Sequence, residues 1–429
     1  MAGVYRQDGG WALAVLFAAL LTHVIVMGMT FSFGIYFVIL KDDLETSHTT
    51  TLWIGALNTS LVFIGGPLAS VMLNRYGCRF TIILGGLLSA AGYISSYFAT
   101  KPYHLGISYG IVTGLGFGLS YTPCVVMVGR YYKKWLYLAT AAACTGEGLG
   151  FVLFPMIFNN LIEEYQWQGS MLINGAISLN IVLCGVIMKP LKAKEENADV
   201  LNLTMFKDLK MMLFALSMVC WNIGVVIVSF IVADFLVERG IELRKGIYLL
   251  TIMGIANMVG HPFAGLTVFC RKWPYANLWL YTITIAITGT VVMLFNTGES
   301  FSAFVVYGIV SSLALGVQLG CLANVVIDLF GIDVFNHSFG YQMASQGVGN
   351  LIGPPIAGIL REKTKNYAVP FYFGGIVTIF SAVIMVVIFG MVKAQKRRES
   401  SGREENETVQ MNLVGNQDAA TTLWLHFYG

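Results

Sequence analysis

Charged residues are scarce in this chain of 429 residues. Asp, Glu, Lys and Arg together make up 11% of the sequence, while 56% of the residues are hydrophobic and the mean hydropathy is +0.70. Soluble globular proteins carry about 25% of these four residues. A water-soluble fold of this length cannot cover its surface with so few charges, so the composition predicts a polytopic membrane protein. It excludes a soluble enzyme, a nucleic-acid-binding protein and a disordered scaffold.

Twelve apolar runs reach the length of about 20 residues that a helix needs to cross a bilayer. Lipid cannot satisfy open backbone N–H and C=O groups, so each run is predicted to be an α-helix. The runs cover residues 11–40, 51–73, 81–99, 105–129, 136–161, 170–188, 211–235, 246–269, 276–295, 301–329, 338–360 and 368–392. The sequence therefore predicts an all-α membrane protein with twelve transmembrane helices.

Lys and Arg are absent from all twelve runs and lie in the connecting segments instead. If both termini lie on one side of the membrane, 18 of the 26 basic residues fall on that side. Loops rich in Lys and Arg stay in the cytoplasm, so we expect cytoplasmic termini. The first run is too long for a cleaved signal peptide and lacks the basic segment that precedes one.

The two halves of the chain contain related motifs in the same order. Each motif of the first half returns 195 to 199 residues later: Gly65-Gly66-Pro67 as Gly260-His261-Pro262, Tyr109-Gly110 as Tyr307-Gly308, and Gly148-x-Gly150 as Gly347-x-Gly349. This offset pairs each helix with the helix six positions further along. Two parallel six-helix halves give that pattern, which is typical of the major facilitator architecture, with a substrate site between the halves near the midplane.

The predicted halves cover residues 1–188 and 211–392. A cytoplasmic linker rich in Lys, Glu and Asn is expected between them, over residues 189–210. A polar tail, predicted to be disordered, follows over residues 393–429.

Two motifs resemble the paired signatures of the monocarboxylate transporter family. The first, Asp8-Gly9-Gly10-Trp11, opens the first helix, and the second runs from Tyr131 through Lys133 and Lys134 to Gly146. The resemblance covers the chain from Asp8 to the last helix. It implies a major facilitator fold and transport of a small organic solute, coupled in some members to a proton.

The resemblance also identifies positions that meet the substrate. Lactate and pyruvate carriers of the family use a Lys on the first helix, and an Asp and an Arg four residues apart on the eighth. The matching positions here are Phe31, Asn257 and His261, so all three charges are absent. The family also contains carriers of creatine, carnitine, aromatic amino acids and thyroid hormones, and this chain resembles that branch more closely.

Glu147 is the one acidic residue near the middle of a predicted helix. A charge there costs roughly 2.5–3.5 kcal/mol of insertion free energy, so we expect such a residue to have a specific functional or structural role. We expect Glu147 to carry a proton or to neutralise a cationic or zwitterionic solute. The alternative is a protonated carboxyl group that is hydrogen-bonded to a neighbouring helix. Asp234 and Asp328 lie near helix ends, where we expect water to reach them.

His261 and Asn257 share one face of the eighth helix, being four residues apart. His261 could replace the missing Arg or accept a proton, and the alternative is a neutral ring bonded to a backbone carbonyl. His23 is expected to make a structural hydrogen bond. Phe31 is expected to stack on a substrate ring or to pack in the core. Further candidates for polar contacts with the solute, each with a structural role as the alternative, are Tyr121, Asn222, Gln318 and Gln342.

The sequence predicts an alternating-access carrier of the plasma membrane. Facilitated transport of a neutral or zwitterionic metabolite is the favoured function, and proton-coupled symport of lactate or pyruvate is the alternative. A receptor on a transporter fold is a second alternative. An enzyme is not expected, because no Ser-His or His-Glu-x-x-His set is present. We expect no cofactor, no metal and no nucleic acid. The expected partners are the solute, the lipid bilayer and a single-span immunoglobulin-like chaperone of the kind on which the family often relies.

Overall fold

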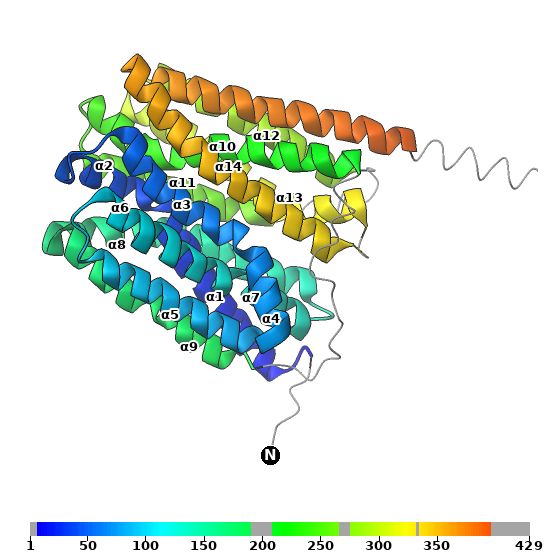
Figure 1. Cartoon of the computed structure of the whole chain (residues 1–429). Helices are drawn as coiled ribbons and strands as arrows, with labels where there is room; N and C mark the ends of the chain where they lie inside the picture. The colour runs from blue at the N-terminus through cyan, green and yellow to red at the C-terminus, as the bar shows by residue number, and fades with distance from the viewer. Residues whose placement is uncertain (1–6, 190–207, 266–274, 332–333, 396–429) are drawn as a thin grey trace, which may run out of the picture.

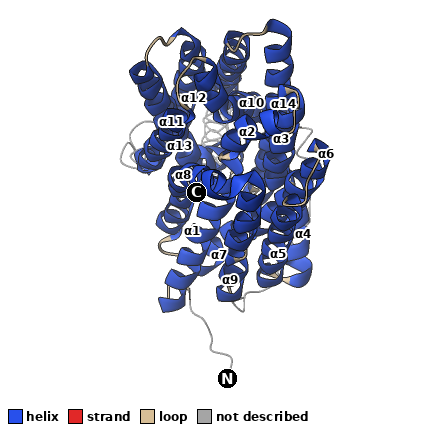
Figure 2. Ribbon diagram, turned by 90° about the vertical axis from the view of Figure 1, so that its left-hand side faces the viewer, coloured by secondary structure: helices blue, strands red, loops and turns tan. Residues whose placement is uncertain are grey.

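The computed structural model describes residues 7–189, 208–265, 275–331 and 334–395, and these residues contain helices but no strand (Figure 2). The helices are α1 (Gly10–Phe31), α2 (Phe33–Asp43), α3 (His48–Ile64), α4 (Gly66–Tyr76), α5 (Cys78–Ser96), α6 (Pro102–Leu105), the π-helix η1 (Gly106–Thr113), α7 (Gly114–Tyr131), α8 (Leu136–Ser178), α9 (Asn180–Ile187), α10 (Leu209–Glu238), α11 (Leu243–Gly265), α12 (Ala276–Leu294), the 3-10 helix η4 (Phe295–Thr297), α13 (Phe301–Phe330), α14 (Phe335–Thr364), and an unlabelled last helix, Ala368–Gln395. They run along one another in a bundle, with the N-terminal helices in the lower part of Figure 1 and the C-terminal helices in the upper part.

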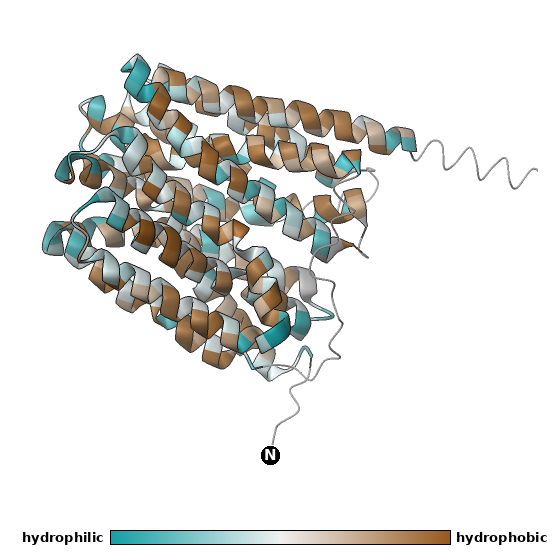
Figure 3. Ribbon diagram, in the orientation of Figure 1, coloured by the Kyte–Doolittle hydropathy of each residue, from teal (hydrophilic) through white to brown (hydrophobic). Residues whose placement is uncertain are grey.

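Nine described helices are long and apolar enough to cross a membrane, or ten if the pair α3 and α4, bent by 44° at Gly65, is one span. One of these, Leu138–Ile187, is 50 residues long and contains a break. Helix α14 is long enough, but polar residues including Gln342 lower its hydropathy. Ten spans result when α3 and α4 are counted as one. Adding α14 and dividing the 50-residue helix into two gives twelve, which is the number predicted from the sequence. Hydrophilic residues concentrate at the two ends of the bundle (Figure 3).

The chain reverses direction within α8. Gln166 has non-helical backbone angles with a positive φ (φ 60°, ψ 174°) in the middle of the helical residues. The ring of Phe158 lies 4.8 Å from the ring of Tyr36, and Nδ2 of Asn174 lies 2.8 Å from Oη of the same tyrosine. Sixteen residues of straight helix would span about 24 Å, so both contacts require the chain to fold back on itself. The two predicted helices, 136–161 and 170–188, are therefore present, but they extend into the segment between them.

Helices α1 and α8 approach each other through glycines. A Cβ atom on Gly150 would lie 2.4 Å from the carbonyl oxygen of Val24 and 2.8 Å from Cα of Gly28. A Cβ atom on Gly146 would lie 2.5 Å from the carbonyl oxygen of Leu20. Small residues allow this backbone contact, which replaces hydrophobic packing as the source of helix association in lipid.

The repeated motifs make equivalent contacts in the two halves. Gly148 of α8 meets Met258 of α11, and Gly347 of α14 meets Ile64 of α3, so each glycine touches a helix of the other half. The second glycine of each motif packs within its own half: Gly150 on α1, and Gly349 on α10. The internal repeat in the sequence therefore corresponds to a repeat in packing.

Replacing Gly150 with valine is expected to destabilise the folded protein by about 1–3 kcal/mol, because the added side chain would collide with backbone atoms of α1. Thermal unfolding of the purified protein in detergent measures this loss as a lower Tm. Gly390→Val is the matched control, since nothing lies within 4 Å of a Cβ atom at Gly390. An unchanged Tm for Gly150→Val would contradict the close approach of α1 and α8.

Candidate functional site

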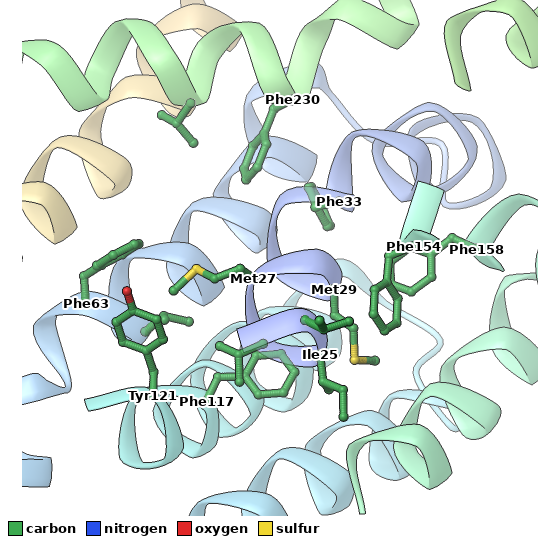
Figure 4. Close-up of a cluster of buried hydrophobic side chains, with 14 of the residues drawn as sticks. Ile25, Met27, Met29, Phe33, Phe63, Phe117, Tyr121, Phe154, Phe158 and Phe230 are labelled. Atoms are coloured by element: carbon green, nitrogen blue, oxygen red, sulfur yellow. The ribbon is translucent and has the colours of Figure 1, made fainter. Parts of the chain in front are cut away.

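A hydrogen bond joins two of the predicted site residues. Oη of Tyr121 on α7 donates to Oε1 of Glu147 on α8 at 2.9 Å. Glu147 is 7% exposed, so its carboxylate lies inside the protein, next to the glycines that bring α1 and α8 together. In Figure 4, Tyr121 extends from its helix toward Phe63, and the two ring centroids lie 6.2 Å apart.

Two residues that the sequence did not select as site residues lie beside Glu147. One ligand atom each from His23, Cys144 and Glu147 lie within 4.8 Å of one another. The ring of His23 is also 4.9 Å from the ring of Tyr121. Nδ1 of His23 donates to the carbonyl oxygen of Ala19 at 2.7 Å, which confirms the predicted structural hydrogen bond. Helical spacing relates residues of one helix, so it gave no indication of the contact between His23 and Cys144.

Asn257 and His261 are buried in α11, with 1% and 6% of their surfaces exposed. Both amide atoms of Asn257 and Nε2 of His261 have no hydrogen-bond partner in the part of the chain that the structure describes. A buried polar atom without a partner costs about 1–3 kcal/mol. Water or a bound solute would remove that cost, so these two side chains are suited to polar recognition.

Phe31 lies at the end of α1 and makes an edge-to-face contact with Phe151 of α8, with 5.3 Å between ring centroids. A Cβ atom on Gly254 of α11 would lie 2.7 Å from the backbone of Phe151. Phe31 therefore stands near the place where α8 meets α11. It is half-buried and packs against the hydrophobic core.

The remaining candidates differ in how their polar atoms are used. Both ends of the Gln318 amide are engaged, because Oε1 accepts from Trp221 Nε1 at 2.6 Å and Nε2 donates to Thr288 Oγ1 at 2.9 Å. Asn222 donates from Nδ2 to the carbonyl oxygen of Met218 at 3.0 Å. The Gln318 contacts tie α13 to α10 and α12, whereas the Asn222 bond lies within α10. Oε1 of Gln342, by contrast, is buried without a partner among the described residues.

An ionic cluster at one end of the bundle was not anticipated. Asp234 was expected to be wetted, but only 3% of its surface is exposed. Its Oδ1 accepts from Lys41 Nζ at 2.8 Å, and its Oδ2 lies 3.4 Å from His48 Nε2 and accepts from the Tyr367 hydroxyl. We call Lys41, His48, Asp234 and Tyr367 the Asp234 cluster. The expectation that water reaches Asp234 was wrong, because a position near a helix end does not reveal which residues cover that end.

The Asp234 cluster connects the two halves. Lys41 and His48 lie at the end of α2 and the start of α3, whereas Asp234 and Tyr367 belong to the C-terminal half. Burial and the neighbouring Asp234 carboxylate raise the pKa of Tyr367 above its usual range, so the hydroxyl stays protonated and donates. A further link across the halves lies nearby, from the backbone N–H of Thr49 to Oε1 of Glu362 at 2.7 Å.

The sequence model of the Major Facilitator Superfamily matches residues 18–298 and 272–428. The chain belongs to this superfamily. Mouse monocarboxylate transporter 6 is 28% identical over 95% of this chain and 93% of its own length, and mouse monocarboxylate transporter 4 is 26% identical over 94% and 88%. Within the superfamily, the chain is a member of the monocarboxylate transporter family.

Solved structures agree with the major facilitator fold. A POT family transporter in complex with a thioalcohol-conjugated peptide matches with a TM-score of 0.73 at 15% identity, over 91% of this chain and 99% of that chain. A POT family transporter in complex with 5-aminolevulinic acid matches with a TM-score of 0.72, also at 15% identity. At this identity the similarity concerns the fold alone.

The two signatures of the monocarboxylate transporter family contact each other in this chain. The carboxylate of Asp8 accepts from the backbone N–H groups of Lys133 and Lys134 at 3.1–3.4 Å, and Asp8 N–H donates to the carbonyl of Tyr131 at 2.9 Å. Trp11 Nε1 donates to the carbonyl oxygen of Ile187 at 3.1 Å. Asp8 thus fastens the start of α1, reached through Gly9 and Gly10, to the segment before α8. The charges of the Lys side chains are not needed for this role.

Replacing Asp234 with asparagine is expected to loosen the contact between the halves. A hydrogen bond to a charged group contributes about 1.5–3 kcal/mol, so backbone N–H groups of residues 44–50 should exchange with deuterium roughly ten- to a hundredfold faster. Asp42→Asn is the control, because the Asp42 side chain is 76% exposed and lies 3.8 Å from the same Lys41 amine. Equal exchange rates in both variants would disprove the role given to Asp234.

Proposed function

We propose that this protein moves a neutral or zwitterionic organic metabolite, of the type of creatine, carnitine or an aromatic amino acid, by facilitated transport. It is a secondary transporter of the monocarboxylate transporter family. The proposal concerns the solute and the driving force.

The positions of Phe31, Asn257 and His261 carry this proposal. In the family's lactate and pyruvate carriers the matching positions hold three charges, whereas here they offer an aromatic ring, an amide and an imidazole. The polar atoms of Asn257 and His261 are buried and unpartnered among the described residues. A lone carboxylate that leaves water needs a cation, and no Lys or Arg lies within the apolar runs to supply one. Amide and imidazole groups can bond an uncharged solute, and Glu147 can balance the ammonium group of a zwitterion.

The Asp234 cluster supports an alternating-access mechanism. It closes one end of the bundle by joining Lys41 of one half to Asp234 of the other. A solute can pass that end only after this ion pair separates, and the two halves then tilt about contacts nearer the middle of the bundle. We further propose that the closed end faces outward, because the sequence assigns 18 of the 26 basic residues to the segments expected on the opposite side, and that the protein resides in the plasma membrane. A single-span immunoglobulin-like chaperone is proposed as its partner for delivery to the surface.

Uptake into proteoliposomes that contain the purified full chain tests the proposal. Labelled creatine, carnitine or tryptophan is expected to enter until its concentrations are equal inside and outside, without accumulation when the outside is made acidic. Lactate is expected to enter no faster than into empty vesicles. Accumulation of lactate driven by the proton gradient would overturn the proposal.

The triple variant Phe31→Lys, Asn257→Asp, His261→Arg serves as the matched comparison in the same assay. It restores the three family charges, so it should gain lactate uptake and lose uptake of the original solute. Circular dichroism and size-exclusion chromatography establish that the variant is folded. No change in solute preference in a folded variant would show that these positions do not select the solute.

Proton-coupled symport of a monocarboxylate is the second candidate, because Glu147 is buried beside Tyr121 and the relatives are named monocarboxylate transporters. In either case, Glu147→Gln and His261→Ala should each lower the initial uptake rate by about tenfold, which corresponds to one lost hydrogen bond to a charged or buried group. Surface levels should remain normal. Under symport, Glu147→Gln would also abolish the response to the proton gradient.

Glu163→Gln and His104→Ala are the controls for these two substitutions. Glu163 is exposed, and His104 is partly exposed in the last turn of α6, far along the chain from Glu147 and His261. Both controls should transport at the normal rate. Full activity of Glu147→Gln and His261→Ala would remove both residues from the site.

A further inference from the structure

The side chains around Glu147 have a donor composition that the transport function does not require. His23 comes from α1, while Cys144 and Glu147 lie three residues apart on one face of α8. Their ligand atoms lie within 4.8 Å of one another. Imidazole nitrogen, thiolate sulfur and carboxylate oxygen are the three ligand types that Zn²⁺ takes in proteins.

The orientation of His23 is a second, independent observation. Its Nδ1 faces the carbonyl oxygen of Ala19, which can only accept, so Nδ1 carries the proton of the neutral ring. Nε2 then holds a free lone pair, and it is buried without a partner in the described part of the chain. His23 is fully buried, so this nitrogen is not solvated. Metal-binding histidines are fixed in this way, with one nitrogen bound to a carbonyl and the other directed at the metal.

Charge balance favours a divalent ion at this place. A thiolate and a carboxylate together neutralise one divalent cation, so the complex carries no net charge in a medium of low dielectric constant. Binding releases the proton of the Cys144 thiol, and no electron is transferred. Tyr121 donates to Glu147, which is the outer hydrogen bond that ligating carboxylates normally have.

The dimensions require a small contraction. Tetrahedral bonds of 2.0–2.3 Å place neighbouring ligand atoms about 3.3–3.8 Å apart, which is about 1 Å closer than the widest separation here. Rotation of the Cys144 and Glu147 side chains can supply this, because both are anchored on the same helix. Three protein ligands leave a fourth position for water.

We propose that His23, Cys144 and Glu147 form a binding site for a divalent transition-metal ion of the Zn²⁺ type. The ion would fasten α1 to α8 beside Tyr121. The sequence predicted no metal, because His23 and Cys144 are far apart in the chain and match no known spacing.

Titration of the purified full chain in nanodiscs with Co²⁺, a spectroscopic substitute for Zn²⁺, tests the proposal. One ion per protein should bind, with a visible spectrum of tetrahedral cobalt and a charge-transfer band from the thiolate, and Zn²⁺ should displace it. Cys144→Ser should lose the charge-transfer band, and His23→Gln should weaken binding at least tenfold. Zn²⁺ should raise the Tm of the natural protein but not that of Cys144→Ser.

Cys321→Ser is the control, because Cys321 is a buried cysteine on α13, in the other half. It should bind Co²⁺ like the natural protein. The proposal is overturned if no saturable binding of one ion occurs, if Cys144→Ser keeps the band, or if Cys321→Ser loses it. The proposed function also gives Glu147 a role, but Co²⁺ binding and Tm are measured without any solute, so failure of the metal site and failure of the proposed function are distinguishable.

Discussion

A polar group inside a lipid bilayer has no water to bond, and this constraint orders the whole molecule. Most buried polar side chains here are satisfied by the protein. Ser217 pairs with Ser381 at 2.8 Å, and Gln318 uses both ends of its amide. Other buried polar atoms have no partner among the described residues. Asn257, Nε2 of His261 and Nε2 of His23 belong to that group, and they lie on α11 and α1, the two helices on which the family resemblance puts the substrate positions.

Close backbone contact is the other consequence of the same constraint. Lipid is as apolar as leucine, so helices gain little by hiding hydrophobic side chains from it. In this chain the helices associate where glycines remove the side chains altogether, as at Gly146 and Gly150 against α1. The Asp8 carboxylate fixes the start of α1 to the segment before α8. The two family signatures therefore act together to hold α1 against α8.

The fold could be predicted from the sequence because its signals are local. Hydropathy gave the helices, and the repeated glycine motifs gave the two halves. The polar site was predictable only in part. Tyr121 and Glu147 were selected separately from the sequence. Their hydrogen bond joins two helices, α7 and α8, so it is visible only in the folded structure. Lys41 and Asp234 are far apart in the chain, and so are His23 and Cys144. Their pairing depends on how helices from different regions pack, for which helical spacing gives no indication. The expectation of a wetted Asp234 failed for the same reason.

The contacts between the halves have a mechanical consequence. Gly148 rests on the backbone and Cβ of Met258, and Gly347 rests on Ile64 and the carbonyl oxygen of Ser60, so on each side a glycine lies close to the backbone of the facing helix. Interlocked side chains would have to leave their pockets before the halves could move. A contact without interlocking side chains permits one half to roll over the other while the distance between the helix axes stays constant. The equivalence of the two contacts gives the motion a near-symmetric pivot, so opening one end and closing the other can be the same movement.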